Sequence, residues 1–240
     1  MILRRLAHSV RSQDWFAVLL ELLIVVAGVF LGFRVNEWAE ERRDRQQERL
    51  LIEQLHADFV ASQERLAWMI ENSEEQVDEL HFATQRVHAG VLAPEERERF
   101  DRAVAMRVRL PSLHLVMGSY RSAVATGEIS LLQDRELRRA LAAFASYVEW
   151  EQGQLDYFRN ADWTDWSLLD PVGDVTYDPA ADRMALRLDF DALAADPDLA
   201  GVVIRSWRNQ SVMLGYRRGL RDRLDELVEL LADELAGASA

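Results

Sequence analysis

The chain has 240 residues, no cysteine and a formal net charge of −13, and every basic residue other than histidine is arginine. The lack of cysteine excludes disulfides, thiolate metal sites and a cysteine nucleophile. The acidic balance, with no dense basic stripe, disfavours nucleic-acid binding. An arginine-rich, lysine-free composition is typical of a GC-rich bacterial genome and by itself predicts no function.

The first element predicted along the chain is a transmembrane helix. Residues 1–14 form a short basic tail with Arg4, Arg5 and Arg11, and the apolar run WFAVLLELLIVVAGVFLGF begins at residue 15. Its nineteen residues make a helix of about 28 Å, close to the hydrocarbon thickness of a bilayer. We therefore expect a tail (1–14), a membrane span (15–35) and a helical soluble domain (36–240).

A cleaved signal peptide is the alternative to an anchor. Val25 and Ala27 are small enough to allow cleavage before Gly28. The apolar run continues to Phe33, however, and Glu21 would lie inside the apolar h-region of the signal peptide, where it would hinder export. These two features favour a retained anchor.

Small and polar residues of the span recur at spacings of three and four, which places them on one helical face. They are Ala17, Glu21, Val25, Gly28, Gly32 and Asn36. The two glycines form a G-x-x-x-G pattern, which allows two helices to approach closely in lipid. The pattern predicts a homo-oligomer or a partner transmembrane helix, and an unpaired anchor is the alternative.

Glu21 lies about 9 Å along the helix from Trp15, which is below the membrane interface. An ionised carboxylate there costs a few kcal/mol, so we expect it to be protonated, paired with another helix or in a water-filled cavity. Two roles stay open for Glu21. One is an interhelical hydrogen bond that sets the register, and the other is a proton or ion site beside a multispan partner.

Orientation in the membrane depends on the arginines that flank the span. The tail has three, and the segment 34–49 has five that alternate with acidic residues. A long following domain crosses largely regardless of its charge, and a first span usually follows its N-terminal flank. We therefore expect an inner-membrane protein with a cytoplasmic tail and a soluble domain outside the cytoplasm.

The soluble domain is patterned as helices throughout. No proline or glycine occurs from Asn36 to Val87, and apolar residues recur at helical spacing after a charged stretch that suits a solvated stalk or coiled coil. A short helix after Pro94, a helix closed by Thr126-Gly127 and a helix from Asp134 to about residue 166 follow. Residues 170–188 suggest a small hairpin, and Asp196-Pro197 opens a long terminal helix. The predicted fold is all-α, an antiparallel helical bundle that continues the membrane helix, with at most one β-hairpin.

No sequence motif for catalysis or cofactor binding is present. His81 and His88 lie seven residues apart and, with Glu74 or Asp78, form only a remote candidate for metal binding, because dependable helical pairs lie three or four apart. One aromatic group suits bundle core better than a ligand pocket: Trp150, Tyr157, Phe158, Trp163 and Trp166. We therefore expect no metal or cofactor, and binding rather than catalysis.

Two segments resemble a widespread family of bacterial single-span membrane proteins of unknown function. IVVAGVFLGFRVNEW is similar to the family's anchor, with Glu21 before it and Asn36 and Trp38 at its end. SYRSAVATGEISLLQDRELRRAL is similar to its second block, a helix, a glycine turn and a capped helix. The resemblance covers about a quarter of the chain and implies an anchored helical domain without an assigned activity.

Overall fold

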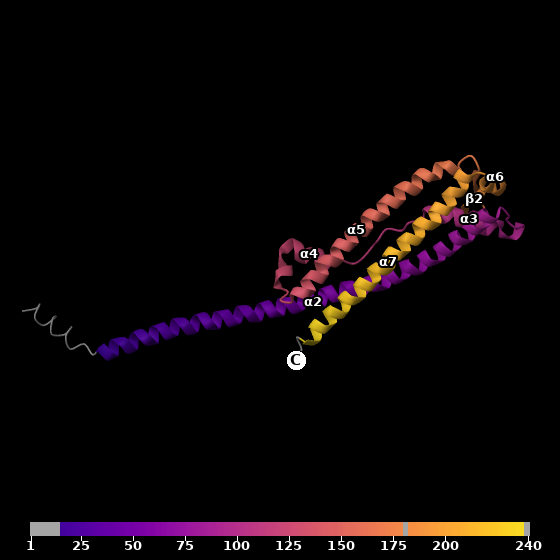
Figure 1. The fold of residues 1–240 in the computed structure, drawn as a ribbon. Helices are drawn as coiled ribbons and strands as arrows, with labels where there is room; N and C mark the ends of the chain where they lie inside the picture. Colours follow the sequence, from indigo (N-terminus) through magenta and orange to yellow (C-terminus); the bar gives the residue numbers. More distant parts are fainter. Residues whose placement is uncertain (1–14, 180–181, 238–240) are drawn as a thin grey trace, which may run out of the picture. The chain divides into compact units, whose positions relative to one another are not determined.

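The structure is a computed structural model that describes residues 15–179 and 182–237. Within these residues it contains six α-helices and one antiparallel β-hairpin, so the prediction of a mainly all-α fold is confirmed (Figure 1). Residue contacts divide the chain into an N-terminal unit, Met1–Leu50, and a C-terminal unit, Leu51–Ala240. The basic tail 1–14 lies outside the described residues.

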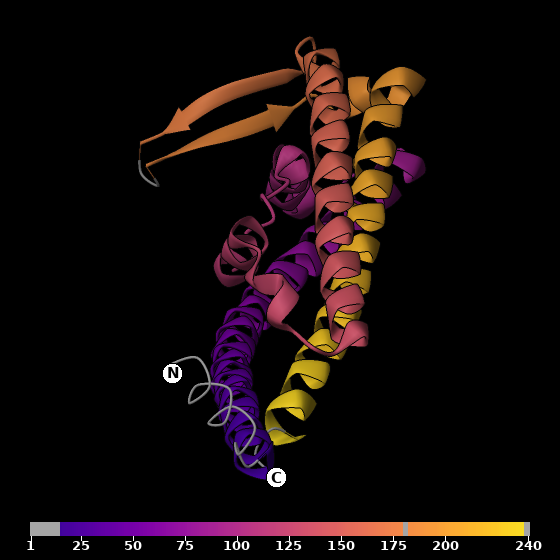
Figure 2. The same ribbon diagram turned by 90° about the vertical axis from the view of Figure 1, so that its left-hand side faces the viewer.

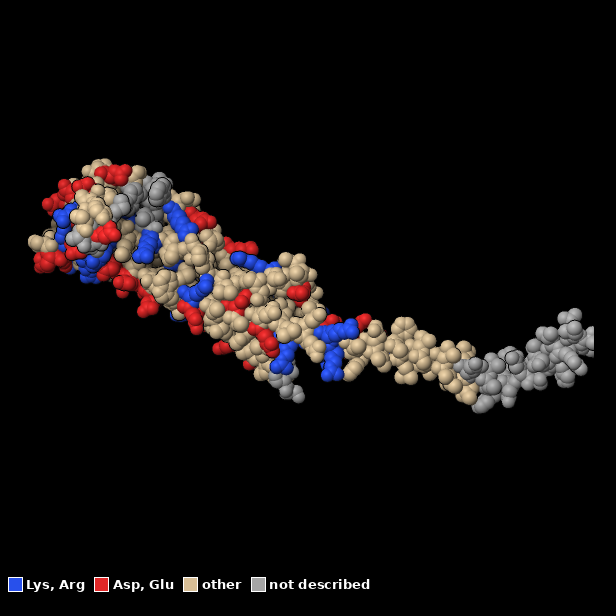
Figure 3. All heavy atoms as spheres, turned by 180° about the vertical axis from the view of Figure 1, so that it is seen from behind, with Lys and Arg blue, Asp and Glu red and all other residues tan. Residues whose placement is uncertain are grey.

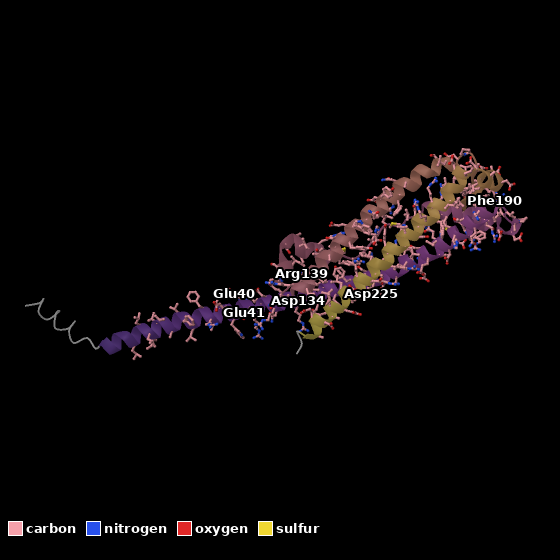
Figure 4. All side chains as sticks on the ribbon, viewed as in Figure 1. Glu40, Glu41, Asp134, Arg139, Phe190 and Asp225 are labelled. Atoms are coloured by element: carbon pink, nitrogen blue, oxygen red, sulfur yellow. The ribbon has the colours of Figure 1, made fainter. Side chains whose placement is uncertain are left out.

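The N-terminal unit contains the first part of helix α2 (Trp15–Ala89). None of its described side chains is buried, so this part of the helix has no core of its own. On the face drawn in Figure 3, the apolar stretch shows no charged atoms between the grey spheres and the first arginines. Beyond it, Glu40 and Glu41 lie on a charged stretch of the helix (Figure 4), where Arg45 pairs with Glu41 at 3.3 Å.

Three long helices form the core of the C-terminal unit: α2 from residue 51, α5 (Arg135–Trp166) and α7 (Pro197–Gly237). The rings of Phe59 and Phe144 meet edge to face at 5.4 Å between α2 and α5. Contacts with α7 run in reverse order along α2. Gln63 donates to the carboxylate of Asp225, which is labelled in Figure 4, at 2.7 Å. Further along α2, the ring of His81 stacks on the ring of Trp207, which comes earlier in α7. Helix α7 is therefore antiparallel to α2, as predicted for the bundle.

Helices α2 and α5 run in the same direction, because a long connection returns the chain to the starting end of the bundle. The connection contains η1 (Pro94–Glu96), α3 (Arg97–Ala105), η2 (Met106–Val108), α4 (Gly118–Thr126) and η3 (Glu128–Leu131). Gly127 closes α4 in the left-handed conformation with φ 82°, and the carboxylate of Asp134 caps α5 by accepting from Leu137 N at 3.1 Å. Both caps agree with the sequence-based prediction.

The predicted hairpin is present as β1 (Gly173–Asp178) and β2 (Arg183–Leu188), with Gly173 opposite Leu188. Figure 2 shows the two strands side by side, followed by a short helix, α6 (Phe190–Ala195), that the sequence analysis did not predict. Asp189 caps α6 by accepting from Ala192 N at 3.1 Å. Phe190 (Figure 4) packs edge to face on Phe100 at 5.1 Å, in a second core cluster with α3.

Candidate functional site

The predicted membrane face lies on α2. Val25 is 58% exposed, and a Cβ added at Gly28 or Gly32 would meet nothing within 4 Å. Asn36 donates from Nδ2 to the Oε1 of Glu40 at 2.9 Å, one turn further along. These residues share one side of a helix that no other described element covers, so the face is open to a partner. The side chains of Ala17 and Glu21 lie outside the described part of the structure.

Helix α2 is the one helix among the described residues that is long and apolar enough to cross a membrane. Its most apolar window has a mean hydropathy of 1.6, and none of that window is buried inside the structure. An apolar helix in the core of a soluble protein would be mostly buried. A signal sequence meets the same criteria of length and composition.

A buried polar centre lies where α2, α5 and α7 meet in the C-terminal unit. It consists of Ser73, Glu151 and Arg217, whose exposed fractions are 3%, 1% and 1%. The guanidinium of Arg217 donates from Nη1 to the hydroxyl of Ser73 and from Nη2 to the carbonyl of Pro111 at 3.1 Å. Arg217 thus joins α7 to α2 and to the extended segment 109–117.

Burial dominates the electrostatics of this polar centre. It raises the pKa of Glu151 to about 7, and the nearby charge of Arg217 only partly opposes this effect. Burial likewise lowers the pKa of Arg217, which the carboxylate of Glu151 counteracts. Glu151 Oε2 and Arg217 Nε are buried without a hydrogen-bond partner in the described structure. The site can therefore take up or release a proton on Glu151 near neutral pH.

Two more polar side chains hold the extended segment beside the polar centre. Arg159 of α5 donates to the carbonyl of Leu110 at 2.7 Å and to the hydroxyl of Ser112 at 2.8 Å. Just before this segment, Gln210 of α7 donates to the carbonyl of Arg107 in η2 at 2.9 Å. Carbonyl groups that have no partner in a helix or sheet are thus satisfied by side chains from two helices.

His81, one of the two histidines considered for metal binding, is engaged in other contacts. The ring of His81 stacks on Trp207 with centroids 4.8 Å apart, and its Nε2 lies 3.4 Å from Nε2 of Gln85. No group of three or more metal-ligating side chains occurs in the part of the chain that the structure describes. His81 therefore serves helix packing.

The aromatic group divides into separate environments. Phe158 is partly buried and packs against Leu155. By contrast, the side chain of Tyr157 is 66% exposed and that of Trp150 is 43% exposed. The expectation of a core position is therefore wrong for Tyr157 and Trp150. The Trp150 ring instead contacts the Tyr216 ring, at a centroid distance of 4.7 Å. The side chains of Trp163 and Trp166 lie outside the described part of the structure.

Sequence reasoning missed the polar centre, although a signal for it was present. Arg217 occupies a position in the apolar stripe Met213, Leu220 and Leu224 of α7, at spacings of four, three and four. A charged residue at a stripe position must be buried with a partner or must interrupt the core. Ser73 and Glu151 fall on the stripes of α2 and α5 in the same way.

Comparison of the chain with protein-family models, with curated proteins and with solved structures found no match.

Proposed function

We propose that the chain is a single-span membrane protein that holds a helical interaction domain at the bilayer surface and self-associates through its membrane helix. In this role it acts as a scaffold or a sensor, not as an enzyme. The proposal agrees with the bacterial single-span family that the anchor segment resembles.

The observation that carries the proposal is the uncovered apolar window of α2. The C-terminal unit buries a continuous set of apolar side chains, whereas Leu22, Ile24 and Phe30 are 62%, 62% and 65% exposed. A soluble monomer rarely leaves so large an apolar surface in water. Insertion into a lipid bilayer removes this apolar surface from water without the need for another protein element.

The free energies of membrane insertion of the individual residues support the same proposal. The run from Trp15 to Phe33 contains thirteen Leu, Ile, Val and Phe residues. At about −0.3 to −0.6 kcal/mol each, they contribute roughly −4 to −8 kcal/mol to insertion. Glu21 opposes this by about 3 kcal/mol when charged, so the sum favours a membrane span.

Self-association is proposed from Gly28 and Gly32, which leave a flat strip on the open face of α2. Helices pack in lipid by close van der Waals contact, and a side chain larger than glycine on this strip would separate the two backbones. The partner in this proposal is a second copy of the chain. A neighbouring span of another protein is the alternative, and in that case Glu21 has the ion-coupled role.

For the orientation, we propose a cytoplasmic tail and a C-terminal unit outside the cytoplasm. The natural sequence has no cysteine, so a single introduced cysteine reports its own accessibility. Ala232, which is exposed on α7, suits the C-terminal unit, and Ser9 suits the tail. With permeabilised outer membranes, a membrane-impermeant thiol reagent should label Ala232→Cys and spare Ser9→Cys, and the reverse pattern would invert the proposed topology.

The anchor itself is tested on the full chain in native membranes. After alkaline carbonate extraction, the chain should stay in the membrane pellet at a mass that retains residues 1–27. A released chain, or a mature chain that begins at Gly28, would contradict the anchor. In energy-transfer measurements between labelled copies, Gly28→Leu should abolish association, whereas Val26→Leu on the opposite face should leave it unchanged.

A further inference from the structure

Two adjoining hollows lie on the surface of the C-terminal unit, between α2 and the chain segment 102–114. The larger has a volume of about 500 Å³ and the smaller about 310 Å³. Trp68 and Pro111 line both hollows, so the two lie next to each other. Each volume is in the range of pockets that hold small ligands.

The larger hollow is apolar at its base. Trp68 is 61% exposed there, beside the buried Met69 and the ring of Pro111. Its charged lining residues, Glu64 and Arg65, have opposite signs and no net charge between them. An exposed indole above an apolar base is suited to contact with a hydrocarbon group.

The smaller hollow is lined by two exposed arginines, Arg102 and Arg109. Within the described part of the chain, Arg109 makes no ion pair, and Arg102 lies 4.0 Å from Glu98, a side chain that is 75% exposed and therefore screened by water. The buried Arg217 adds positive charge behind this hollow, because its donors reach Ser73 and Pro111, which both line it.

Acidic side chains compensate only part of this charge. Glu79 is held by Arg99, whose Nε and Nη2 lie 3.0 and 2.9 Å from its oxygens, so that pair is neutral. Glu75 is the other acidic residue of the lining. Among the lining side chains, Arg102 and Arg109 against Glu75 leave a net charge of about +1, which favours an anion.

We propose that the two adjoining hollows together bind one long-chain fatty acid. Its hydrocarbon chain lies against Trp68 and Met69 in the larger hollow, and its carboxylate lies near Arg109 and Arg102 in the smaller one. A carboxylate carries one negative charge, whereas the phosphate monoester of lysophosphatidate carries more and would exceed the positive charge of the lining. The inference goes beyond the proposed function and does not require that α2 spans a membrane.

Photo-crosslinking of the full chain tests this assignment. The chain, in bilayer discs of neutral lipid, is exposed to a diazirine-labelled fatty acid, and the crosslinked peptides are mapped by mass spectrometry. We expect crosslinks in residues 64–79 and 102–114, with competition by unlabelled palmitate. Labelling confined to other parts of the C-terminal unit, or equal competition by hexadecanol or lysophosphatidate, would overturn the proposal.

Matched variants separate a specific site from general labelling. Arg109→Gln and Trp68→Ala should each weaken crosslinking in these two peptides about tenfold, whereas Arg121→Gln and Trp150→Ala, which alter exposed residues outside both hollows, should leave it unchanged. Equal labelling of all four variants would refute the site. Helical content by circular dichroism checks that each variant is folded.

The same experiment distinguishes this inference from the proposed function. A chain that spans the bilayer also crosslinks in residues 20–36, whatever happens at the hollows. If labelling of 20–36 is absent and that of the hollows persists, the anchor fails and the fatty-acid site stands. The opposite result removes the site and leaves the anchor in place.

Discussion

Glu151 should make the stability of the C-terminal unit depend on pH near neutrality. Burial raises its pKa to about 7 from an ordinary value of 4.5. The folded unit therefore binds this proton more tightly than the unfolded chain does. The stability that comes from the neutral carboxyl is fully present below pH 4.5 and is lost as the pH rises to about 7. The difference between the two pKa values corresponds to about 3 kcal/mol.

Glu151→Gln tests this reasoning, because the amide mimics the neutral carboxyl at every pH. Unfolding of the full chain by urea in mild detergent is followed by circular dichroism at pH 5 and pH 8. Raising the pH from 5 to 8 should cost the natural chain about 2.5 kcal/mol of stability more than it costs Glu151→Gln, because part of the loss has already occurred at pH 5. The exposed neighbour Glu149 provides the control, since Glu149→Gln should keep the pH dependence of the natural chain.

Two results would refute the argument. If Glu151→Gln loses stability with pH as steeply as the natural chain, Glu151 does not hold its proton in the folded state. If the variant is less stable than the natural chain at pH 8, the charge interaction with Arg217 outweighs the cost of burial, and the direction given for the pKa is wrong.

Three further predictions follow from the contacts described. Arg217→Met leaves Glu151 buried without an opposite charge and should lower the free energy of unfolding by about 3–5 kcal/mol at pH 8 in the same urea assay, and by less at pH 5. Gly127→Ala forces an alanine to φ 82° and should lower the free energy of unfolding by about 1 kcal/mol. Gly153→Ala, at an exposed position within α5, should raise the free energy of unfolding by up to about 1 kcal/mol, and denaturant midpoints measure both changes. Glu21→Gln should keep energy transfer between labelled copies within twofold, because the amide still forms a hydrogen bond, and loss of assembly would show that Glu21 acts in its charged form.

Local signals in the sequence were sufficient for most of the helical elements. Gly127 and Asp134 were identified as caps because their chemistry acts within a few residues, and the alternation of Leu186 and Leu188 indicated a strand. Helix α6 was missed because six residues are too few to display a helical period. Its cap, Asp189, was the only local signal.

The long-range arrangement could not be derived from such signals. Ser73, Glu151 and Arg217 come from three helices, and nothing in the spacing within any one helix indicates that they meet. The two hollows likewise depend on how the segment 109–117 lies along α2. The proposed anchor is the opposite case, because a membrane span is a property of one continuous segment and is predicted from the residues of that segment alone.

The order of contacts in the bundle has a consequence for biosynthesis. Gln63 and Asp225 are partners 162 residues apart, and Glu74 and Arg218 are 144 apart. The apolar stripe of α2 is therefore synthesised long before α7 exists to cover it, and loop closure over such separations is slow. A chain that stalls before residue 197 lacks α7 and would expose the part of the α2 stripe that α7 covers. Until the last helix has been translated, that part of α2 lacks the element that covers it.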